Sequence, residues 1–502
     1  MTDHALRLLQ ENPHLAELAA FPFNFDLDRA DHVEDVRLAS DGPLKPIAGD
    51  DTGGTYFVCA DGSVLYADSE GSAGIIGDSV DEALEILVGL PGWHDCLGLA
   101  PSDGEEKILA EIAETEEEIR EYYGIDAERD ELRAALGLPA RTPVELIGRL
   151  HAALMRTEPE FLLLNAEEGG AYALLDRHPR PPLWETVLQP GRADLALLRE
   201  GSSWDEVARD RGRRALALRA AQYDRRDTDL GLLRHLLKHE AEASMTDELR
   251  LAAVLVGLHG LAEDLPLLYE VRETTYDTWC GLGGMPEPGA GGEELREWAL
   301  GLDDSLFGTD PSDEPLSTWT GLAREQGMTE VARAVLIRGL DEIDLRAFGN
   351  RPARTDKFEL RSLAYEFTEL GDTFQALRAY RLHVPLRSRC DDRVSALLTL
   401  SRMEREAGEF PAAVRALKSL RDALAKPWDD TLPHWRGTQL GARIVEEHHE
   451  VARAATADAT ADTTLAEDVR EVTRAAAEIL AELSEAARAS VRQRPIPESP
   501  AG

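Results

Sequence analysis

Residues 250–268 of this 502-residue chain read RLAAVLVGLHGLAEDLPLL, and this stretch decides the fold class. Its alanine and leucine residues recur at the three- and four-residue spacing of a helix, and a short turn follows them. A second helix is entered through Asp264 and Pro266, because aspartate satisfies free backbone N–H groups and proline suits the first helical turn. Residues 228–240 supply a helix before it. We therefore expect a series of short helices packed on one another.

A related pattern of small and aromatic residues surrounds Gly371 further along the chain. It comprises Leu363, Ala364, Phe367, Gly371, Asp372, Ala376 and Tyr380. A second copy contains Ala407, Gly408, Glu409, Ala413 and Leu417, and a weaker copy contains Gly327, Ala332 and Leu336. These copies resemble tetratricopeptide repeats, and residues 250–268 resemble a HEAT repeat. Because the three glycines are 37 and 44 residues apart, the copies are degenerate repeats.

Helical spacing continues from about residue 142 to residue 490, and Thr142, Pro143 and Glu145 form a capping-box pattern at its start. Repeats of this kind bury their apolar faces only by stacking, so we expect an α-solenoid from roughly 160 to 490. A compact helical domain with ordinary αα-hairpins is the alternative, and the sequence leaves both open.

The first hundred residues differ, because they carry strand signals. Residues 54–59 and 63–66 flank the pair Asp61-Gly62, a strong hairpin signal since both residues tolerate positive φ. Residues 73–77 supply a third strand, and a helix follows over residues 80–88. The predicted fold class is α+β but predominantly α, with a small antiparallel hairpin sheet ahead of the helical repeats.

We predict five segments along the chain. They are a small α+β domain over 1–100, acidic connecting helices over 101–160, a HEAT-like region over 161–300, a tetratricopeptide-like region over 301–490 and a disordered tail over 491–502. Residues 101–131 contain thirteen acidic and three basic residues, yet a sparse apolar stripe that includes Ile108 and Ile112 remains. This stripe favours a surface helix over a disordered segment. The Gly- and Pro-rich clusters at 281–292 and 303–315 are predicted loops and candidate domain boundaries.

Acidic residues dominate the composition, with 95 Asp and Glu against 54 Lys and Arg, a net charge of −41. Because 43% of residues are apolar, the chain can form hydrophobic cores, which excludes a wholly disordered protein. Nucleic-acid binding is not expected, since phosphate recognition needs a basic surface. The seven arginines between 209 and 226 are therefore expected to pair with acidic neighbours inside the protein.

The four cysteines are far apart and form no Cys-x-x-Cys pair, so we expect small buried thiols in a reducing compartment. No apolar run is long enough to cross a membrane, and the N-terminus lacks the pattern of a secretory signal. We expect a soluble cytoplasmic protein that binds no membrane. The sequence predicts no oligomeric state.

No catalytic or cofactor site is expected, because no nucleophile, base and orienting group occur in a recognisable pattern. His235 and His239 are one helical turn apart, but Leu236 stands where a zincin-like helix has its glutamate. We interpret them as solvated or partly buried helix histidines and predict no metal site. The loop Gly49–Gly54 lacks the lysine of a phosphate-binding loop, so we interpret it as a structural turn.

Residues 46–66 resemble the central part of the SUKH superfamily. The matching residues are Pro46, Ile47, the small and acidic run 48–51, Gly53, Gly54, the strand 55–58 with its aromatic pair, the Asp61-Gly62 hairpin and the second strand 63–66. The helix expected over 79–88 adds to this likeness. The family's customary N-terminal helix and acidic-aromatic segment are not clear here, and residues 17–24 stand in their place. The resemblance implies a small α+β domain, of a kind that often serves as an immunity protein neutralising bacterial toxins, many of them nucleases.

These observations support two functions, neither of them enzymatic. The first is capture of a basic protein partner, such as a toxin domain, because residues 1–100 carry nineteen acidic and four basic residues. The candidate contacts lie near the hairpin and are Asp50, Asp51, Asp61, Asp68 and Glu70. The second is a helical-repeat adaptor that binds peptides of cellular proteins in a groove within residues 327–425, with the N-terminal domain incidental.

Overall fold

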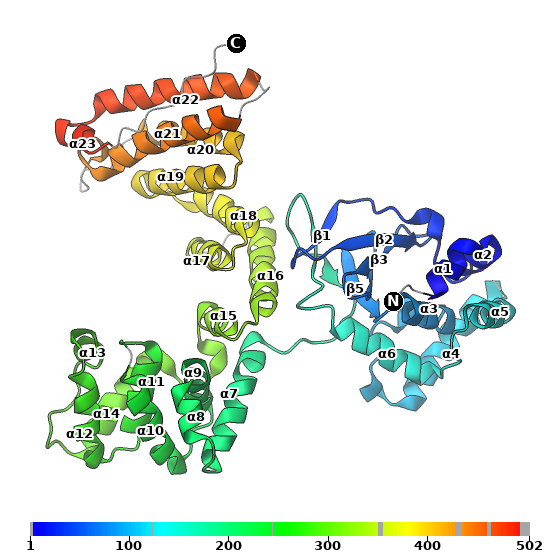
Figure 1. Cartoon of the computed structure of the whole chain (residues 1–502), viewed down its shortest axis with the longest axis horizontal. Helices are drawn as coiled ribbons and strands as arrows, with labels where there is room; N and C mark the ends of the chain where they lie inside the picture. Colours follow the sequence, from blue (N-terminus) through cyan, green and yellow to red (C-terminus); the bar gives the residue numbers. More distant parts are fainter. Residues whose placement is uncertain are drawn as a thin grey trace. The chain divides into compact units, whose positions relative to one another are not determined.

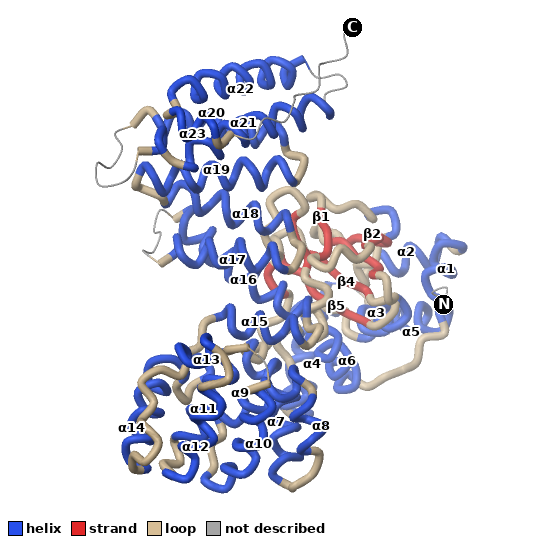
Figure 2. The backbone as a smooth tube through the Cα atoms, turned by 60° about the vertical axis from the view of Figure 1, so that its left-hand side comes forward, coloured by secondary structure: helices blue, strands red, loops and turns tan. Residues whose placement is uncertain are grey.

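The structure is a computed structural model that describes residues 4–122, 124–242, 244–349, 355–426, 434–458 and 463–491. It divides into two compact units, Met1–Val33 with Leu38–Leu162 and Ala173–Val335, and Glu34–Arg37 with Leu163–Tyr172 and Leu336–Gly502. Figure 2 shows helices throughout and strands only in the N-terminal part of the chain. The predicted class, α+β but predominantly α, is confirmed. Apart from Val491, the predicted tail lies outside the described residues.

The N-terminal sheet has five strands in the order β2-β3-β4-β5-β7. Their bounds are Leu44–Gly49, Thr55–Cys59, Val64–Ala67, Ser72–Gly77 and Ala173–Leu174. Strands β2 to β5 are antiparallel neighbours, and β7 runs parallel to β5. The predicted hairpin is confirmed: Gly62 has φ +95° in the β3–β4 turn, a conformation that glycine adopts without strain. Strands β1 (Val36–Leu38) and β6 (Leu163–Asn165) form a separate two-stranded sheet.

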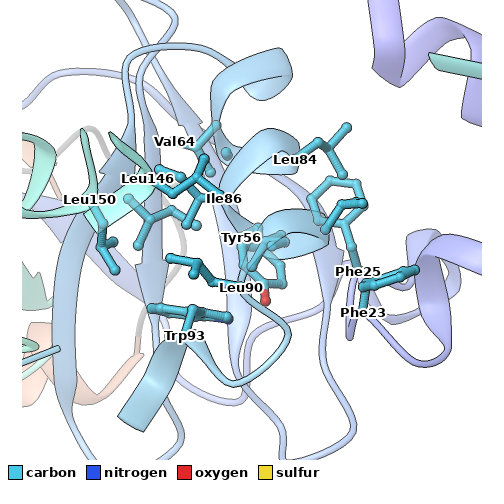
Figure 3. Packing of buried hydrophobic residues seen from close by; sticks show 14 of the residues in the cluster. Phe23, Phe25, Tyr56, Val64, Leu84, Ile86, Leu90, Trp93, Leu146 and Leu150 are labelled. Atoms are coloured by element: carbon cyan, nitrogen blue, oxygen red, sulfur yellow. The ribbon is translucent and has the colours of Figure 1, made fainter. Parts of the chain in front are cut away.

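Helices pack around this sheet and form one hydrophobic cluster with it. They are α1 (His4–Glu11), α2 (Pro13–Ala20), α3 (Val80–Gly89), α4 (Glu105–Tyr122), α5 (Asp126–Leu136) and α6 (Pro143–Met155). Figure 3 shows Tyr56 and Trp93 packed among leucine and isoleucine side chains, and both residues are almost fully buried. Helix α3 begins at the predicted place because the Ser79 side chain accepts a hydrogen bond from the Glu82 N–H.

Residues 101–160 do not form a connector of the predicted kind. Ile108 and Ile112 of α4 are 1% and 4% exposed and belong to the same cluster as the sheet. Leu146 and Leu150 of α6 join them there, and α6 contacts β5. Sparse apolar residues at helical spacing bury one face of α4 and leave most of its glutamates in solvent. The predicted capping box at Thr142 and Glu145 is confirmed.

The remainder of the first unit is helical. It comprises α7 (Leu183–Arg199), α8 (Trp204–Arg209), α9 (Arg211–Tyr223), α10 (Leu230–Glu240), α11 (Asp247–Gly257), α12 (Leu265–Arg272), α13 (Tyr276–Gly281), α14 (Gly292–Leu302), α15 (Leu316–Glu325) and the start of α16 (Thr329–Phe348). The segment 303–315, predicted as a loop and candidate boundary, holds a π-helical turn over Asp303–Phe307 and a 3-10 turn over Pro311–Asp313. Its Asp303 and Glu314 bind arginines of the α9 region, so this segment belongs to the packed helices.

The second unit is built from successive helix pairs, a helical-repeat architecture (Figure 1). Its helices are the end of α16, α17 (Asp356–Glu369), α18 (Thr373–His383), α19 (Cys390–Glu406), α20 (Phe410–Leu424), α21 (Gln439–Asp458), α22 (Thr463–Glu482) and α23 (Glu485–Ala489). Gly371 and Gly408 end the first helix of their pairs with φ near +75°, as does Gly327 between α15 and α16. The glycines that marked the predicted repeats are therefore the left-handed residues that end these helices.

A loop between β6 and β7 belongs to this second unit and docks on α18. The carbonyl oxygen of Gly169 accepts hydrogen bonds from Gln375 at 2.7 Å and from Arg378 at 3.1 Å. Gly169 has φ +74°, and a Cβ there would lie 2.3 Å from the Phe374 ring. Only glycine therefore fits this close approach.

The prediction of buried thiols holds for Cys59 and Cys96; Cys390 is only half-buried, and the prediction is wrong for Cys280, which is exposed. Burial raises the pKa of both Cys59 and Cys96 to about 12, which keeps them protonated. Cys280 is exposed because the short helix α13 presents it to solvent beside the exposed Tyr276. No helix among the described residues is both long and apolar enough to span a membrane.

Candidate functional site

Asp50, predicted to contact a partner, is a buried structural carboxylate with 2% exposure. The Tyr66 hydroxyl donates to Oδ2 at 2.5 Å, and the N–H groups of Thr52 and Gly54 donate to Oδ1 at 2.9 and 2.8 Å. Burial by itself would raise the pKa of Asp50, but these hydrogen bonds outweigh it and leave the pKa below its ordinary value. Asp50 therefore holds the turn before β3, and its carboxylate is buried instead of exposed to solvent.

The same contacts confirm that Gly49–Gly54 is a structural turn. Its N–H groups at Thr52 and Gly54 point at the Asp50 carboxylate, so they are not free to bind an external anion. Glycine is required at position 54, because an added Cβ would lie 2.2 Å from the Tyr66 hydroxyl.

Asp61 and Asp68 also stabilise their own turns. Oδ1 of Asp61 accepts from the Ser63 N–H at 3.0 Å, and its Oδ2 lies 3.1 Å from the Arg156 guanidinium. Oδ1 of Asp68 accepts from the N–H groups of Glu70 and Ser72 at 2.9 and 2.8 Å. Both carboxylates remain partly accessible, but Asp61 is already paired with a cation.

The structure brings four of the five predicted contacts to one end of the sheet, namely the buried Asp50 together with Asp51, Asp68 and Glu70. Because Thr55 pairs with Ala67, the turn before β3 and the turn after β4 lie at the same end of the sheet. The Ser69 hydroxyl joins the two turns by donating to the Thr52 carbonyl oxygen at 3.1 Å. Asp61 lies in the β3–β4 turn at the opposite end. Apart from the buried Asp50, the acidic sheet end therefore consists of Asp51, Asp68 and Glu70, of which Asp51 and Glu70 are exposed.

Several arginines between 209 and 226 pair with carboxylates inside the first unit, as predicted. Arg214 donates to Glu240 at 2.6 Å, and their side chains are 7% and 3% exposed. Arg213 donates to Asp194 at 2.6 Å, and Arg225 donates to both carboxylate oxygens of Asp303 at 2.7 Å each. These cations are therefore paired with carboxylates of the first unit.

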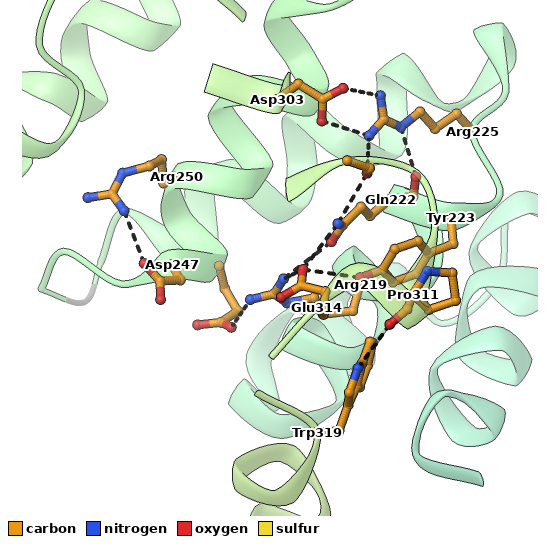
Figure 4. Close-up of polar contacts among 12 residues, drawn as sticks. Arg219, Gln222, Tyr223, Arg225, Asp247, Arg250, Asp303, Pro311, Glu314 and Trp319 are labelled. Carbon is orange, nitrogen blue, oxygen red and sulfur yellow. Dashed lines mark hydrogen bonds and ion pairs between the residues drawn. The ribbon is translucent and has the colours of Figure 1, made fainter. Parts of the chain in front are cut away.

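Arg219 lies at the centre of this network, which Figure 4 shows. It donates to Glu314 at 2.9 Å, and the Tyr223 hydroxyl donates to the same carboxylate at 3.1 Å. Glu248 lies 3.4 Å from the Arg219 guanidinium, so two carboxylates share one buried arginine. The network ties the segment around Glu314 to α9 and so fixes the path of the chain toward α15.

The second unit contains a groove of about 750 Å³ between helices of its repeats. Helix α17 contributes Arg361, Ala364, Tyr365 and Thr368; α18 and the turn after it contribute Tyr380, His383 and Arg387; α19 contributes Asp392, Ser395, Ala396, Thr399, Arg402, Met403 and Glu406. The groove thus lies within residues 327–425, where the sequence led us to expect a peptide-binding groove. Its walls combine cationic, acidic, hydroxyl and apolar side chains.

The groove lining carries a small excess of positive charge in a strongly acidic chain, with Arg361, Arg387 and Arg402 against Asp392 and Glu406. Arg361 and Arg402 are exposed, and neither forms an ion pair or hydrogen bond with any residue in the described part of the chain. Arg387 donates to His383 Nε2 at 3.0 Å. Burial, and then the charges of Arg387 and Arg361, lower the pKa of His383 to about 4. His383 is therefore a neutral acceptor, and the two unpaired arginines carry the groove's available positive charge.

Large aromatic side chains are exposed along the same helix. Phe358 and Tyr365 are 62% and 61% exposed, although soluble proteins usually bury such residues. Phe358, Arg361, Tyr365 and Thr368 follow one another at three- and four-residue spacing, so they share one face of α17. Lys357 lies 4.8 Å from the centre of the Phe358 ring. This face therefore offers aromatic surface and positive charge side by side.

Comparisons with known proteins do not identify a family for this chain. The resemblance of residues 46–66 to the SUKH superfamily thus stays a prediction. No protein-family model matches the chain, and searches of curated proteins and of solved structures find nothing similar to it.

Proposed function

We propose that this protein is a non-enzymatic binding scaffold whose helical-repeat groove holds an acidic segment of a partner protein. The observation that carries the proposal is the pair Arg361 and Arg402, which face the groove without a carboxylate partner among the described residues. A guanidinium presents a planar set of donors that matches a carboxylate, so each arginine suits a Glu or Asp side chain or a chain terminus.

The exposed aromatic residues indicate which other side chains the partner segment should carry. Tyr365 lines the groove, and Phe358, on the same face of α17, adds exposed apolar surface next to it that water solvates poorly. An apolar or aromatic side chain of the partner would cover them, while flanking carboxylates meet Arg361 and Arg402. We propose that α17–α18 and α19–α20 are degenerate tetratricopeptide-like repeats, and that residues 250–268 form a HEAT-like repeat.

Fluorescence anisotropy with the full chain tests this proposal. The probes are three labelled peptides of equal length with a central phenylalanine, flanked by glutamates, by alanines or by lysines. We expect the glutamate peptide to bind most tightly and its affinity to fall as salt is added. Arg361→Glu with Arg402→Glu should weaken it at least tenfold, which corresponds to about 1.4 kcal/mol. Equal binding of all three peptides, or binding unaffected by the double charge reversal, would refute the proposal.

A matched control separates the groove from general charge. Arg211→Glu with Arg209→Glu changes the net charge by the same amount at two arginines outside the groove. These variants should bind the glutamate peptide as the wild type does. A similar loss in both pairs would mean that overall charge, and not the groove, attracts the peptide.

A second candidate function is capture of a basic protein through the acidic sheet end, as an immunity protein of the SUKH type would do. Its supporting observation is that Asp51, Asp68 and Glu70 gather at one end of the sheet, with Asp51 and Glu70 exposed. Titration calorimetry of the full chain with a small basic nuclease domain tests it. Asp51→Asn with Glu70→Gln should weaken the complex at least tenfold, whereas Asp61→Asn, at the other end of the sheet, should not.

A further inference from the structure

Two histidines of α10 meet an aspartate of α8. His235 and His239 are four residues apart and therefore lie on one face of α10. Helix α8 packs against α10, and its Asp205 lies over this face. One ligand atom from each of the three residues lies within 4.8 Å of the other two. Among the described residues, this is the one group of three or more potential ligands that is so close together.

The arrangement already approaches the spacing that a metal ion requires. Nε2 of His235 and Oδ1 of Asp205 are 3.4 Å apart. Two ligands of a tetrahedral zinc ion, each about 2.0–2.1 Å from the metal, lie about 3.3 Å from each other. The His235 and His239 rings have their centres 5.0 Å apart at an angle of 65°, so His239 completes the set by a small side-chain rotation.

The surroundings of His235 position its ring and leave one ring nitrogen without a hydrogen-bond partner. Nε2 of His235 is buried and has no hydrogen-bond partner. The Trp204 ring lies 5.4 Å from the His235 ring, and its indole N–H is anchored on the Leu198 carbonyl oxygen at 2.7 Å. The carboxylate of Glu242 is 3.8 Å from His239 Nδ1 and can supply a fourth ligand by rotation.

Competing cations at this place are few and weakly held. Arg209 lies 3.5 Å from Asp205, and both side chains are more than two-thirds exposed. An exposed pair of this kind contributes little, so a divalent ion can displace the arginine. Lys238 also lies on α10, three residues after His235 and therefore near it, but its side chain is exposed and can extend into solvent when an ion binds.

We propose that Asp205, His235 and His239 form a binding site for a divalent transition-metal ion, with zinc as the best match. Two imidazoles and one carboxylate suit zinc, cobalt or nickel, and they suit magnesium or calcium poorly because those ions prefer oxygen ligands. The ion would join α8 to α10 and leave one coordination position for Glu242 or water. This site is separate from the groove of the second unit.

The test is calorimetric titration of the full chain with zinc after chelator treatment, together with the visible spectrum of the cobalt-loaded protein. We expect one zinc per chain and a rise in melting temperature, because the ion binds only the folded arrangement. Cobalt should give the intense bands of a four-coordinate site. His235→Gln or His239→Gln should weaken zinc binding at least tenfold, and His259→Gln, a histidine of the same helical region outside the site, should leave it unchanged.

Asp205→Asn keeps the test decisive if a histidine variant fails to fold, since the Asp205 side chain is exposed and its replacement preserves the fold. It should weaken zinc binding several-fold while the melting temperature of the metal-free protein stays the same. Zinc binding that all three site variants leave unchanged, or tighter binding of magnesium than of zinc, would overturn the proposal.

Discussion

The arginines around α9 and the arginines of the groove show how one residue type serves two purposes. Arg214 and Arg219 are buried, and each one binds a carboxylate from a neighbouring segment, Glu240 and Glu314 respectively. Arg361 and Arg402 are exposed on a concave surface and have no such partner in the described chain. A buried arginine without a carboxylate would be strongly destabilising, whereas an exposed one costs little. The unpaired arginines are therefore available for a partner, and the paired ones are not.

The largest expected effect is a loss of stability when a buried arginine is replaced. Arg214→Met leaves Glu240 buried without its cation, and we expect the free energy of unfolding to fall by about 3–5 kcal/mol. Urea unfolding followed by circular dichroism measures it. The double variant Arg214→Met with Glu240→Met should recover most of the loss, because no unpaired charge remains. A single variant as stable as the wild type would contradict a structural role for this pair.

A pH experiment tests the electrostatics of the groove itself. The pKa of His383 is lowered to about 4, whereas a histidine in the unfolded chain titrates near 6.5. Between these values the unfolded state binds more protons, so stability is fully present above pH 6.5 and falls as the pH drops toward 4. The loss is on the order of 3 kcal/mol for this histidine. His383→Gln should flatten the pH dependence of urea unfolding; an unchanged slope would show that His383 titrates normally.

The same contrast between buried and exposed groups applies to the carboxylates of the sheet. Asp50→Ala removes the acceptor of the Tyr66 hydroxyl and of two N–H groups, and should cost about 2–3 kcal/mol of unfolding free energy. Asp51→Ala changes an exposed side chain next to it and should stay within about 0.5 kcal/mol. Thermal unfolding of the two variants checks this, and equal effects would mean that Asp50 is not the structural residue of the turn.

The smallest effect is expected for the groove arginines. Arg361→Gln with Arg402→Gln should change the unfolding free energy by no more than about 0.5 kcal/mol, since neither side chain has a partner to lose. Arg361→Gln should also raise the pKa of His383 slightly, because one positive charge near the ring is removed. Urea denaturation measures the change in unfolding free energy, and NMR titration of the imidazole measures the change in the pKa of His383. A large loss of unfolding free energy would show that these arginines stabilise the fold, as the buried ones do.

The local features of the fold were predictable from the sequence, because they depend on neighbours in the chain. The Asp61-Gly62 hairpin and the left-handed glycines at 371 and 408 are of this kind. The packing of residues 101–160 against the sheet was not predictable, because the many acidic residues of α4 concealed how completely Ile108 and Ile112 are buried. Acidic residues on one face of a helix say nothing about the burial of the other.

The candidate sites depended on distant residues and were harder to predict. Asp50 looks like a surface acid until Tyr66, sixteen residues later, is seen to donate to it. Aromatic residues at helical spacing usually belong to a core, so Phe358 and Tyr365 gave no sign of exposure. Asp205 is thirty residues before His235, and only the packing of α8 on α10 brings them together.

Hydrogen–deuterium exchange of the full chain, with and without the glutamate-flanked peptide, tests the central claim most directly. We predict that the peptide slows exchange in α17 and α19, which line the groove, and leaves α9 and the β3–β4 hairpin unchanged. The Arg361→Glu with Arg402→Glu variant should lose this protection. Protection at the hairpin or around α9, or none in α17 and α19 at saturating peptide, would contradict the claim that the unpaired groove arginines are the binding site.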